Sequence, residues 1–321
     1  MRFAAGRLLH GALLLLAVSF AAFAFAQFAP GDYYSDLAAN PTIAPETVEA
    51  LRQQAGLHRP FLTRYVDWLA SAARGDFGVS LAYGGPVAPL IAERIRNTLL
   101  LTGTATVVAW LLAAPIGIWA ATRRGFTDMA LRVAMAVLLL IPDLLLAIVL
   151  LAVAVQTGWF PAGGMQSPDA GSMSAIERLR DTAWRLVLPA SVLAIGMLPV
   201  LVRHVRAAMQ ETMNAPFALA ARAHGIPARR RLFRHILPVA ANPLIGLFGL
   251  SLGALLSASL LVEVVMGWPG LGPFLVDAIL SRDIAVVLSA VVLSAAFLIA
   301  GNTAADLLLY RIDPRIRRGR G

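Results

Sequence analysis

A few polar side chains interrupt long apolar runs in this sequence, and they are its first candidates for chemistry. Asp143 stands in "IPDLLL", Glu263 ends another apolar run, and Asn302 lies within the last one. A charge at the centre of a bilayer costs at least ~2.5–3.5 kcal/mol, so Asp143 should face a cavity or a partner. We predict that they line a path for a polar solute. For Asp143, a hydrogen-bonded helix contact beside Pro142 is an equally good interpretation.

The residue types exclude several kinds of chemistry. The chain has no lysine, which a Walker A nucleotide loop and a Schiff base both require. It has no cysteine, which excludes disulfides and thiolate metal sites. His224 and His235 are separated by Gly225 and Pro227, a spacing that favours surface contact over metal ligation. We therefore expect no catalytic site and no cofactor or metal bound by this chain.

The composition indicates a membrane protein, because 59% of the residues are hydrophobic and only 14% are charged. Soluble domains carry about a quarter charged residues. The apolar residues form blocks near the ~20 residues that span a bilayer, at 8–28, 98–121, 133–155, 186–202, 239–262 and 284–309. We predict an all-α polytopic protein, a single transmembrane domain over 1–321 with six spans. The bounds of 186–202, which contains Pro189 and Pro199, are the least certain.

The first apolar run also has features of a signal peptide, with Arg2 and Arg7 before it and "AFAQ" at 24–27. A signal-peptide core is only ~7–15 residues long, and this run extends from 8 to 26. We favour a retained first helix. A mature chain that starts at Gln27 would contradict this expectation.

The formal charge of +9 comes from arginines that are distributed unevenly. With the N-terminus inside, the short outside loops hold only Arg178, Arg180, Arg185 and Arg282, and the remaining short-loop arginines lie inside. This bias is the positive-inside rule. It predicts cytoplasmic termini, an extracytoplasmic segment at 29–97 and a cytoplasmic loop at 203–237. The rule also accounts for the positive net charge, so we expect no nucleic-acid partner.

The segment 29–97 is expected to be structured. "APETVEALRQQAG" (44–56) reads as a helix with Pro45 in its first turn and Gly56 at its end. In "YVDWLASAAR" (65–74), one apolar face can lie on the membrane or pack against the spans, and we favour packing. Its members are Tyr65, Trp68, Leu69 and Ala72.

The outside loop 266–285 carries Pro269, Gly270, Gly272 and Pro273, which should prevent a continuous helix. Trp268 and Phe274 in this loop suit a membrane interface.

The loop "ALAARAHGIPARRRLFRHILP" (218–238) should form a helix with Asn214 as its cap and Pro216 in its first turn. Gly225 should end it, and a second helix should follow Pro227. The first helix is a slim rod ~14 Å long. Such a rod suits insertion into a cleft on a cytoplasmic protein, whereas the neighbouring arginines could instead bind lipid headgroups at ~1 kcal/mol each.

This loop resembles the EAA loop of ABC-importer permeases. Ala220, Ala221, Gly225, Leu237 and Pro238 match the pattern, whereas Leu219 replaces its Glu and His235 its Ile. Four further stretches are similar to dipeptide, oligopeptide and nickel permeases of the type with an extended first extracytoplasmic segment. They are "AGLHRPFLTRYVDWLASAARGDFGVSL" (55–81), "GWFPAGG" (158–164), "VEVVMGWPGLGPFLVDAILSRD" (262–283) and "DLLLYRIDPRIR" (306–317).

The resemblance implies a type I importer permease in the bacterial inner membrane that works by alternating access. Its partners would be a second homologous permease, two cytoplasmic ATPases that hold ATP and Mg, an extracytoplasmic solute-binding protein, and membrane lipid. Residues 217–225 would be the coupling helix that docks on an ATPase. The implied coupling residues are Phe217, Ala220, Ala221, Gly225, Arg229, Arg230, Leu237 and Pro238.

Two other functions remain as alternatives at this point. A secondary transporter driven by an ion gradient would need several mid-membrane charges, which are sparse here. A non-transporting scaffold would leave the cytoplasmic rod unexplained. The substrate stays open between dipeptides, oligopeptides, nickel chelates, glutathione and some sugars. The family usually has a small hydroxyl residue where Asp143 stands, so a carboxylate there would favour a cationic substrate.

Overall fold

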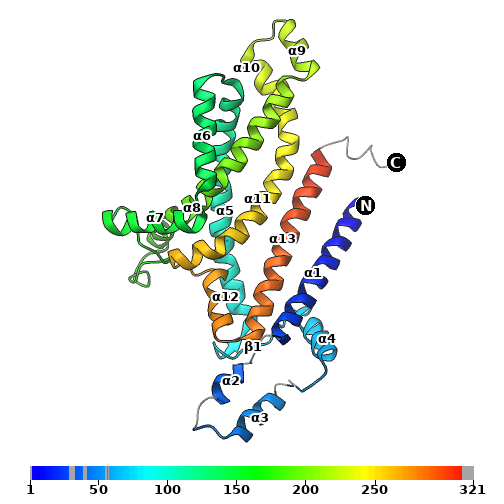
Figure 1. The fold of residues 1–321 in the computed structure, drawn as a ribbon, viewed down its shortest axis with the longest axis vertical. Coiled ribbons are helices and arrows are strands. Elements are labelled where there is room, and N and C mark those ends of the chain that lie inside the picture. The colour runs from blue at the N-terminus through cyan, green and yellow to red at the C-terminus, as the bar shows by residue number, and fades with distance from the viewer. Residues whose placement is uncertain (1, 29–32, 39–41, 55, 57, 313–321) are drawn as a thin grey trace. The chain divides into compact units, whose positions relative to one another are not determined.

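The computed structural model describes residues 2–28, 33–38, 42–54, 56 and 58–312, and its described part is almost entirely helical (Figure 1). The elements are α1 (Arg2–Phe28), α2 (Tyr33–Ala38), α3 (Pro45–Gln54), α4 (Phe61–Ala72), β1 (Val79–Ser80), β2 (Gly85–Pro86), α5 (Val87–Thr122), α6 (Phe126–Leu140), α7 (Asp143–Thr157), α8 (Ala175–Met213), α9 (Pro216–Ala223), α10 (Ala228–Arg231), the π-helix η1 (Leu232–Ile236), α11 (Leu237–Met266), α12 (Leu271–Leu280) and α13 (Ile284–Ile312).

Five described helices are long and apolar enough to cross a membrane, and a bent pair of helices supplies a sixth span if it counts as one. The five contain Gly6–Phe28, Val87–Thr122, Ala175–Met213, Ala228–Met266 and Ile284–Ala304. The pair is α6 and α7. The predicted all-α polytopic fold is confirmed, and the helices begin and end at bounds that differ from the apolar runs.

The predicted third span at 133–155 is not one straight helix. The chain bends by 93° between α6 and α7. Ile141 has extended dihedrals (φ −83°, ψ 115°) because a residue before proline is disfavoured in the helical region. Pro142, at φ −61° and ψ 139°, then precedes the first residue of α7. Asp143 therefore lies at the N-terminus of a helix, at the bend of this broken span.

The bounds predicted for the fourth span were also wrong, because α8 is a 39-residue helix that continues through Pro189 and Pro199. Its start is fixed by a capping box, in which the Ser174 N–H donates to Glu177 Oε2 (2.8 Å) and the Glu177 N–H donates to Ser174 Oγ (3.4 Å). At 1.5 Å per residue α8 is ~58 Å long, almost twice the hydrocarbon thickness. The apolar run 186–202 covers only the middle of α8, and the polar ends of the helix extend beyond it.

The chain divides into two compact units, residues 1–98 with 269–299 and residues 99–268 with 300–321. In the first unit, Phe23 of α1 packs with Tyr65 of α4 and Leu288 of α13. Ser19 Oγ and Tyr65 Oη lie 3.0 Å apart, within hydrogen-bond distance. Trp68 and Leu69 join this cluster. The predicted apolar face of 65–74 therefore packs against a span, as we expected, through these three residues.

Two turns of the first unit are joined by Asp283, which is fully buried. Its Oδ2 accepts hydrogen bonds from Ser80 Oγ (2.7 Å) and from the Ala82 N–H (3.1 Å). The described strands β1 and β2 form a short antiparallel pair next to this link. The segments around "GDFGVSL" and "LSRD" are thus held together by one carboxylate.

The loop after α11 is not a continuous helix, as predicted, but it differs from the prediction in two details. A helix, α12, begins at Leu271, so Gly272 and Pro273 lie in its first turn, and residues 267–270 and 281–283 interrupt the helices. Proline is tolerated there because first-turn N–H groups have no helical partner. Trp268 is 1% exposed and Phe274 is also buried. The placement of these two rings at a membrane interface was therefore wrong, since both pack inside the protein.

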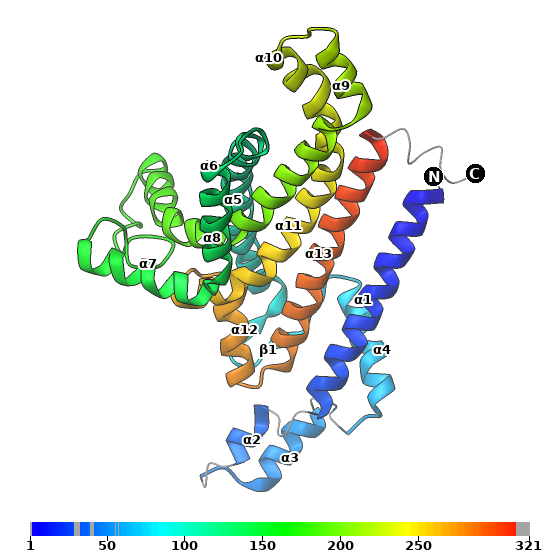
Figure 2. The ribbon, with the colours of Figure 1, turned by 45° about the horizontal axis from the view of Figure 1, so that its top comes forward.

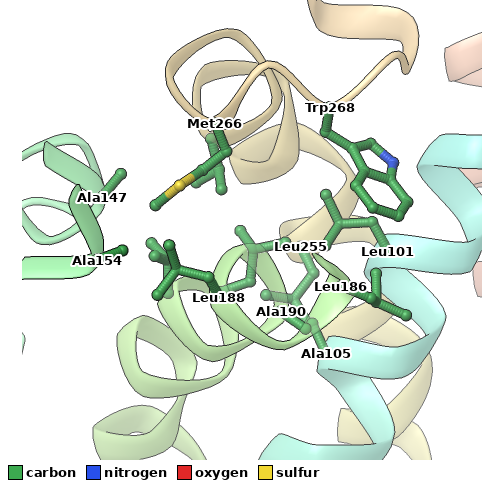
Figure 3. Packing of buried hydrophobic residues seen from close by; sticks show 13 residues of the cluster. Leu101, Ala105, Ala147, Ala154, Leu186, Leu188, Ala190, Leu255, Met266 and Trp268 are labelled. Atoms are coloured by element: carbon green, nitrogen blue, oxygen red, sulfur yellow. The ribbon is translucent and has the colours of Figure 1, made fainter. Parts of the chain in front are cut away.

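The main core of the second unit joins α5, α7, α8 and α11. Figure 3 shows Met266 pointing toward Ala147 and Ala154 of α7, whereas the ring of Trp268 lies near Leu101 of α5. Small alanines on α7 let this short helix approach α8 and α11 closely. The position of Asp143 is fixed by this packing, because α7 starts with it.

Candidate functional site

The loop between α8 and α11 folds into two short helices, α9 and α10, at one end of these long helices (Figures 1 and 2). Pro216 is the first residue of α9, as predicted, because its fixed φ and missing N–H suit that position. Ala215 is the N-cap and makes no side-chain capping bond. Asn214, which we expected to cap α9, instead ends α8, since α8 runs on to Met213.

Gly225 ends α9 as predicted, at a φ of +70°. The Ile226 N–H donates to the Ala221 carbonyl (3.1 Å), and the Gly225 N–H donates to the Arg222 carbonyl (3.0 Å). These two hydrogen bonds require a residue in the left-handed conformation, and glycine adopts it without steric cost because it has no Cβ. A Cβ at Gly225 would have no neighbour within 4 Å. Glycine is therefore needed here for its backbone angle and not for space.

The short helix α9 has one face on its own chain and one face free. Ala218 and Ala221 are 2% and 8% exposed, and Ala218 packs in a cluster with Met209 of α8 and Ile236 of η1. Phe217 and Leu219 are 43% and 52% exposed, and Ala220 is exposed beside them. The buried alanines hold the rod to α8, and the free apolar face is available to a partner.

The remaining predicted coupling residues lie around the turn into α11. Arg229 and Arg230 are exposed on α10, and Arg231 donates to the Ile226 carbonyl (3.4 Å). Leu237 packs against the cluster of Ala218 and Ile236, whereas Pro238 is exposed. The matched residues thus divide into an exposed set and a set that fixes the loop.

A π-helix connects the loop to α11, and the sequence did not lead us to expect it. In η1 the Leu237 N–H donates to the Leu232 carbonyl, five residues earlier. Pro238 follows directly. Its ring has no N–H for the Arg234 carbonyl and would clash with that carbonyl in a regular α-helix. We attribute the wider turn to this proline. Single π turns often occur at functional sites.

The predicted path residues lie in three different helices of the second unit. Asp143 starts α7 and faces α8 at Gly196, where an added Cβ would overlap its carboxylate. A helix N-terminus is also a favourable place for a carboxylate. Gly196 was missed by sequence reasoning, and only its lack of a side chain at a helix contact identifies it.

Glu263 is fully buried in the last turn of α11. Gly267 then ends this helix at φ +62°, and the Trp268 N–H donates to the Glu263 carbonyl (2.9 Å). The "GWFPAGG" loop meets this end, because the Gly164 N–H donates to the Met266 carbonyl (3.1 Å). Asn302 is half-buried on α13. Among the described residues, no group of three His, Asp or Glu side chains is placed to hold a metal.

Comparisons with known proteins place these features in a family. Residues 113–318 match the binding-protein-dependent transport system inner membrane component, and residues 1–102 match the N-terminal part of such membrane components. This chain belongs to that permease family. The matches cover the α9–α10 loop and all of the bent pair.

The permease has relatives of nearly its full length. It is 34% identical to the oligopeptide transport system permease protein AppB of Bacillus subtilis, over 94% of this chain and 95% of AppB. It is 36% identical to a putative peptide permease protein of Brucella ovis, over 99% of both chains. A chain of the inward-facing MetNI methionine ABC transporter has the same fold, with a TM-score of 0.57, 19% identity, and coverage of 70% of this chain and 96% of that chain.

These similarities confirm that the protein is a membrane component of an ATP-driven importer and lies in the inner membrane. The alternative of a secondary transporter driven by an ion gradient is set aside. Residue roles within the permease rest on its own geometry, which separates a free face on α9 from the buried face beneath it.

Proposed function

We propose that this permease carries peptides, or a chemically related small solute, inward across the membrane by alternating access. The names of its relatives, which extend over the whole chain, support a peptide substrate. The proposed partners are a second permease, two ATPases that bind ATP and Mg, and an extracytoplasmic solute-binding protein. This chain contributes the pore and no nucleotide site, consistent with its lack of lysine.

The observation that carries the proposal is the α9 rod. Its Ala218 and Ala221 are fixed on the chain, and its Phe217 and Leu219 are free. One face of α9 is packed on its own chain, and the opposite face is apolar and exposed. A helix held in this way can transmit a movement of a bound ATPase to α8 and α11. In this proposal Phe217 and Ala220 contact the ATPase. Gly225, Leu237 and Pro238 set the angle of the rod, and Ala221 anchors it.

The exposed arginines Arg229 and Arg230 complete the proposed contact by pairing with acidic side chains of the ATPase. This assignment places 203–237 in the cytoplasm and 29–97 outside, within a single transmembrane domain over 1–321. The sidedness rests on the arginine distribution.

We further propose that Asp143 lies on the substrate path, with Glu263 and Asn302 as further polar positions. The bend after Pro142 places the Asp143 carboxylate at the start of a helix, half-buried against Gly196. A carboxylate in such a path favours solutes that carry a positive charge.

The test is purification of the tagged chain from membranes that also express the neighbouring genes. We expect a second permease and one or two ATPases to copurify, with ATP hydrolysis that rises when a peptide-loaded binding protein is added. Recovery of this chain as a homo-oligomer without an ATPase would contradict the assembly. Stimulation by a different solute and not by peptides would contradict only the substrate.

A further inference from the structure

A groove of about 220 Å³ lies between α6 and α8 in the second unit. Its apolar wall includes Met135 and Leu139 of α6 and Pro199 of α8, with the buried Ala120 of α5 among them. Three arginines complete the lining, Arg132 of α6 and Arg203 and Arg206 of α8. The predicted coupling and path residues do not line this groove.

The groove has a charged end and an apolar end. Asp128 of α6 binds both Arg132 and Arg206, which places these arginines together (Arg206 Nη2–Asp128 Oδ1 2.8 Å; Arg132 Nη2–Asp128 Oδ2 3.1 Å). Leu139 lies seven residues beyond Arg132, and Pro199 lies seven residues before Arg206. At 1.5 Å per residue, each wall runs ~10 Å from the arginines to its apolar end.

The charges at the arginine end do not balance. Asp128 is buried and is the one carboxylate that pairs with these arginines in the described part of the chain. Arg203 is exposed and forms no ion pair there. Arg206 Nε is buried without a hydrogen-bond acceptor among the described groups. Three positive charges against one negative charge, with an unfilled donor, fit a ligand that brings an anionic oxygen.

The surroundings of the groove are those of a membrane boundary. Val133, Val137 and Leu140 project from α6 as exposed apolar side chains. Arg203 and Arg206 follow directly on the apolar run 186–202 of α8. Arginines just beyond a hydrocarbon span lie at the depth of lipid headgroups, and basic pockets between transmembrane helices bind anionic ones.

We propose that this groove is a binding site for an anionic phospholipid. Its phosphate is held by Arg203, Arg206 and Arg132, and an acyl chain lies along Met135, Leu139 and Pro199. A phospholipid supplies both an anionic oxygen and an apolar chain in the order that the groove presents them. The site fixes α6, the helix that precedes the bend at Pro142, to α8.

The experiment titrates the delipidated complex in neutral detergent with dioleoyl phosphatidylglycerol, dioleoyl phosphatidylcholine or glycerol 3-phosphate, and reads bound ligand by native mass spectrometry. We expect tight binding of phosphatidylglycerol and none of the other two. Arg203→Gln should weaken it about fivefold, the value of ~1 kcal/mol per arginine. Arg124→Gln removes an exposed arginine outside the groove lining and should leave it unchanged.

Three results would overturn the site. Equal binding of phosphatidylcholine would show a merely apolar surface, and binding of glycerol 3-phosphate alone would show a site for free phosphates. If phosphatidylglycerol bound to the Arg203→Gln and Arg124→Gln variants equally well, Arg203 would not be part of the site.

Since the chain has no cysteine, cross-linking from a Leu139→Cys variant also identifies the molecule that covers the groove. Its cross-linking to the second permease would assign the groove to that protein.

Discussion

Gly225 and Gly196 both need to be glycines, but for different physical reasons. Gly225 has open space around it and a left-handed backbone, whereas a Cβ at Gly196 would overlap the Asp143 carboxylate. The first glycine therefore sets an angle and the second makes room. Substitutions can separate these two requirements.

We predict that Gly225→Val leaves membrane insertion intact and strongly reduces ATP-driven uptake by the reconstituted complex. A left-handed conformation costs a Cβ residue ~1–2 kcal/mol, so the turn after α9 should shift. Gly225→Asn is the control, because asparagine accepts this conformation more readily, and it should retain most of the uptake. Full uptake by the valine variant would show that the end of α9 does not matter for coupling.

At Asp143, we predict that Asp143→Asn lowers uptake of cationic peptides about tenfold relative to neutral ones, the loss expected for one charged hydrogen bond. Competition between a lysyl and an alanyl dipeptide in vesicles measures the ratio. An unchanged ratio would remove Asp143 from the substrate path. Gly196→Ala should alter the same ratio, because it displaces the carboxylate.

Among the helices, the sequence predicted those whose ends are marked by nearby proline and glycine residues. Pro45 and Gly56 bracket α3, and Pro216 and Gly225 bracket α9, as expected from capping rules. The break at Pro142 was missed because an apolar run hides a bend that proline imposes on the backbone. The extent of α8 was missed because its polar ends lie outside the apolar stretch.

Sequence reasoning singled out the loop that holds α9 and α10 but could not divide its residues into two faces. The α9 alanines look alike in sequence, and only packing on Met209 and Ile236 distinguishes Ala218 from its exposed neighbour Ala220. Leu219 was read as a departure from a pattern, and its exposure now makes it part of the free face. Which α9 residues are buried and which are exposed depends on tertiary contacts between distant segments, and the resemblance to a family did not reveal it.

The π-helix η1 gives a prediction at this scale. Pro238→Ala restores an N–H for the Arg234 carbonyl and should let η1 close to a regular helix, which changes the register between α10 and α11 by one residue. We expect ATP hydrolysis to lose most of its stimulation by the binding protein, with no fall in the melting temperature of the complex. Pro243→Ala is the matched control, since Pro243 lies within α11 and does not follow a π-turn. Equal stimulation in both variants would contradict a role for η1.

In the whole molecule, we propose that the free face of α9 is the contact with an ATPase. The absence of cysteine makes this directly measurable, because one introduced cysteine is the only thiol of the chain. Leu219→Cys places it on the free face of α9, and Ser172→Cys places it at an exposed position before α8.

The most direct measurement is the rate of maleimide labelling of these two variants, in the permease alone and with cysteine-free ATPase subunits bound. We expect Leu219→Cys to react rapidly in the permease alone and to be protected in the complex, whereas Ser172→Cys should react equally in both. Unprotected labelling of Leu219→Cys in a complex that hydrolyses ATP would contradict an ATPase contact on this face.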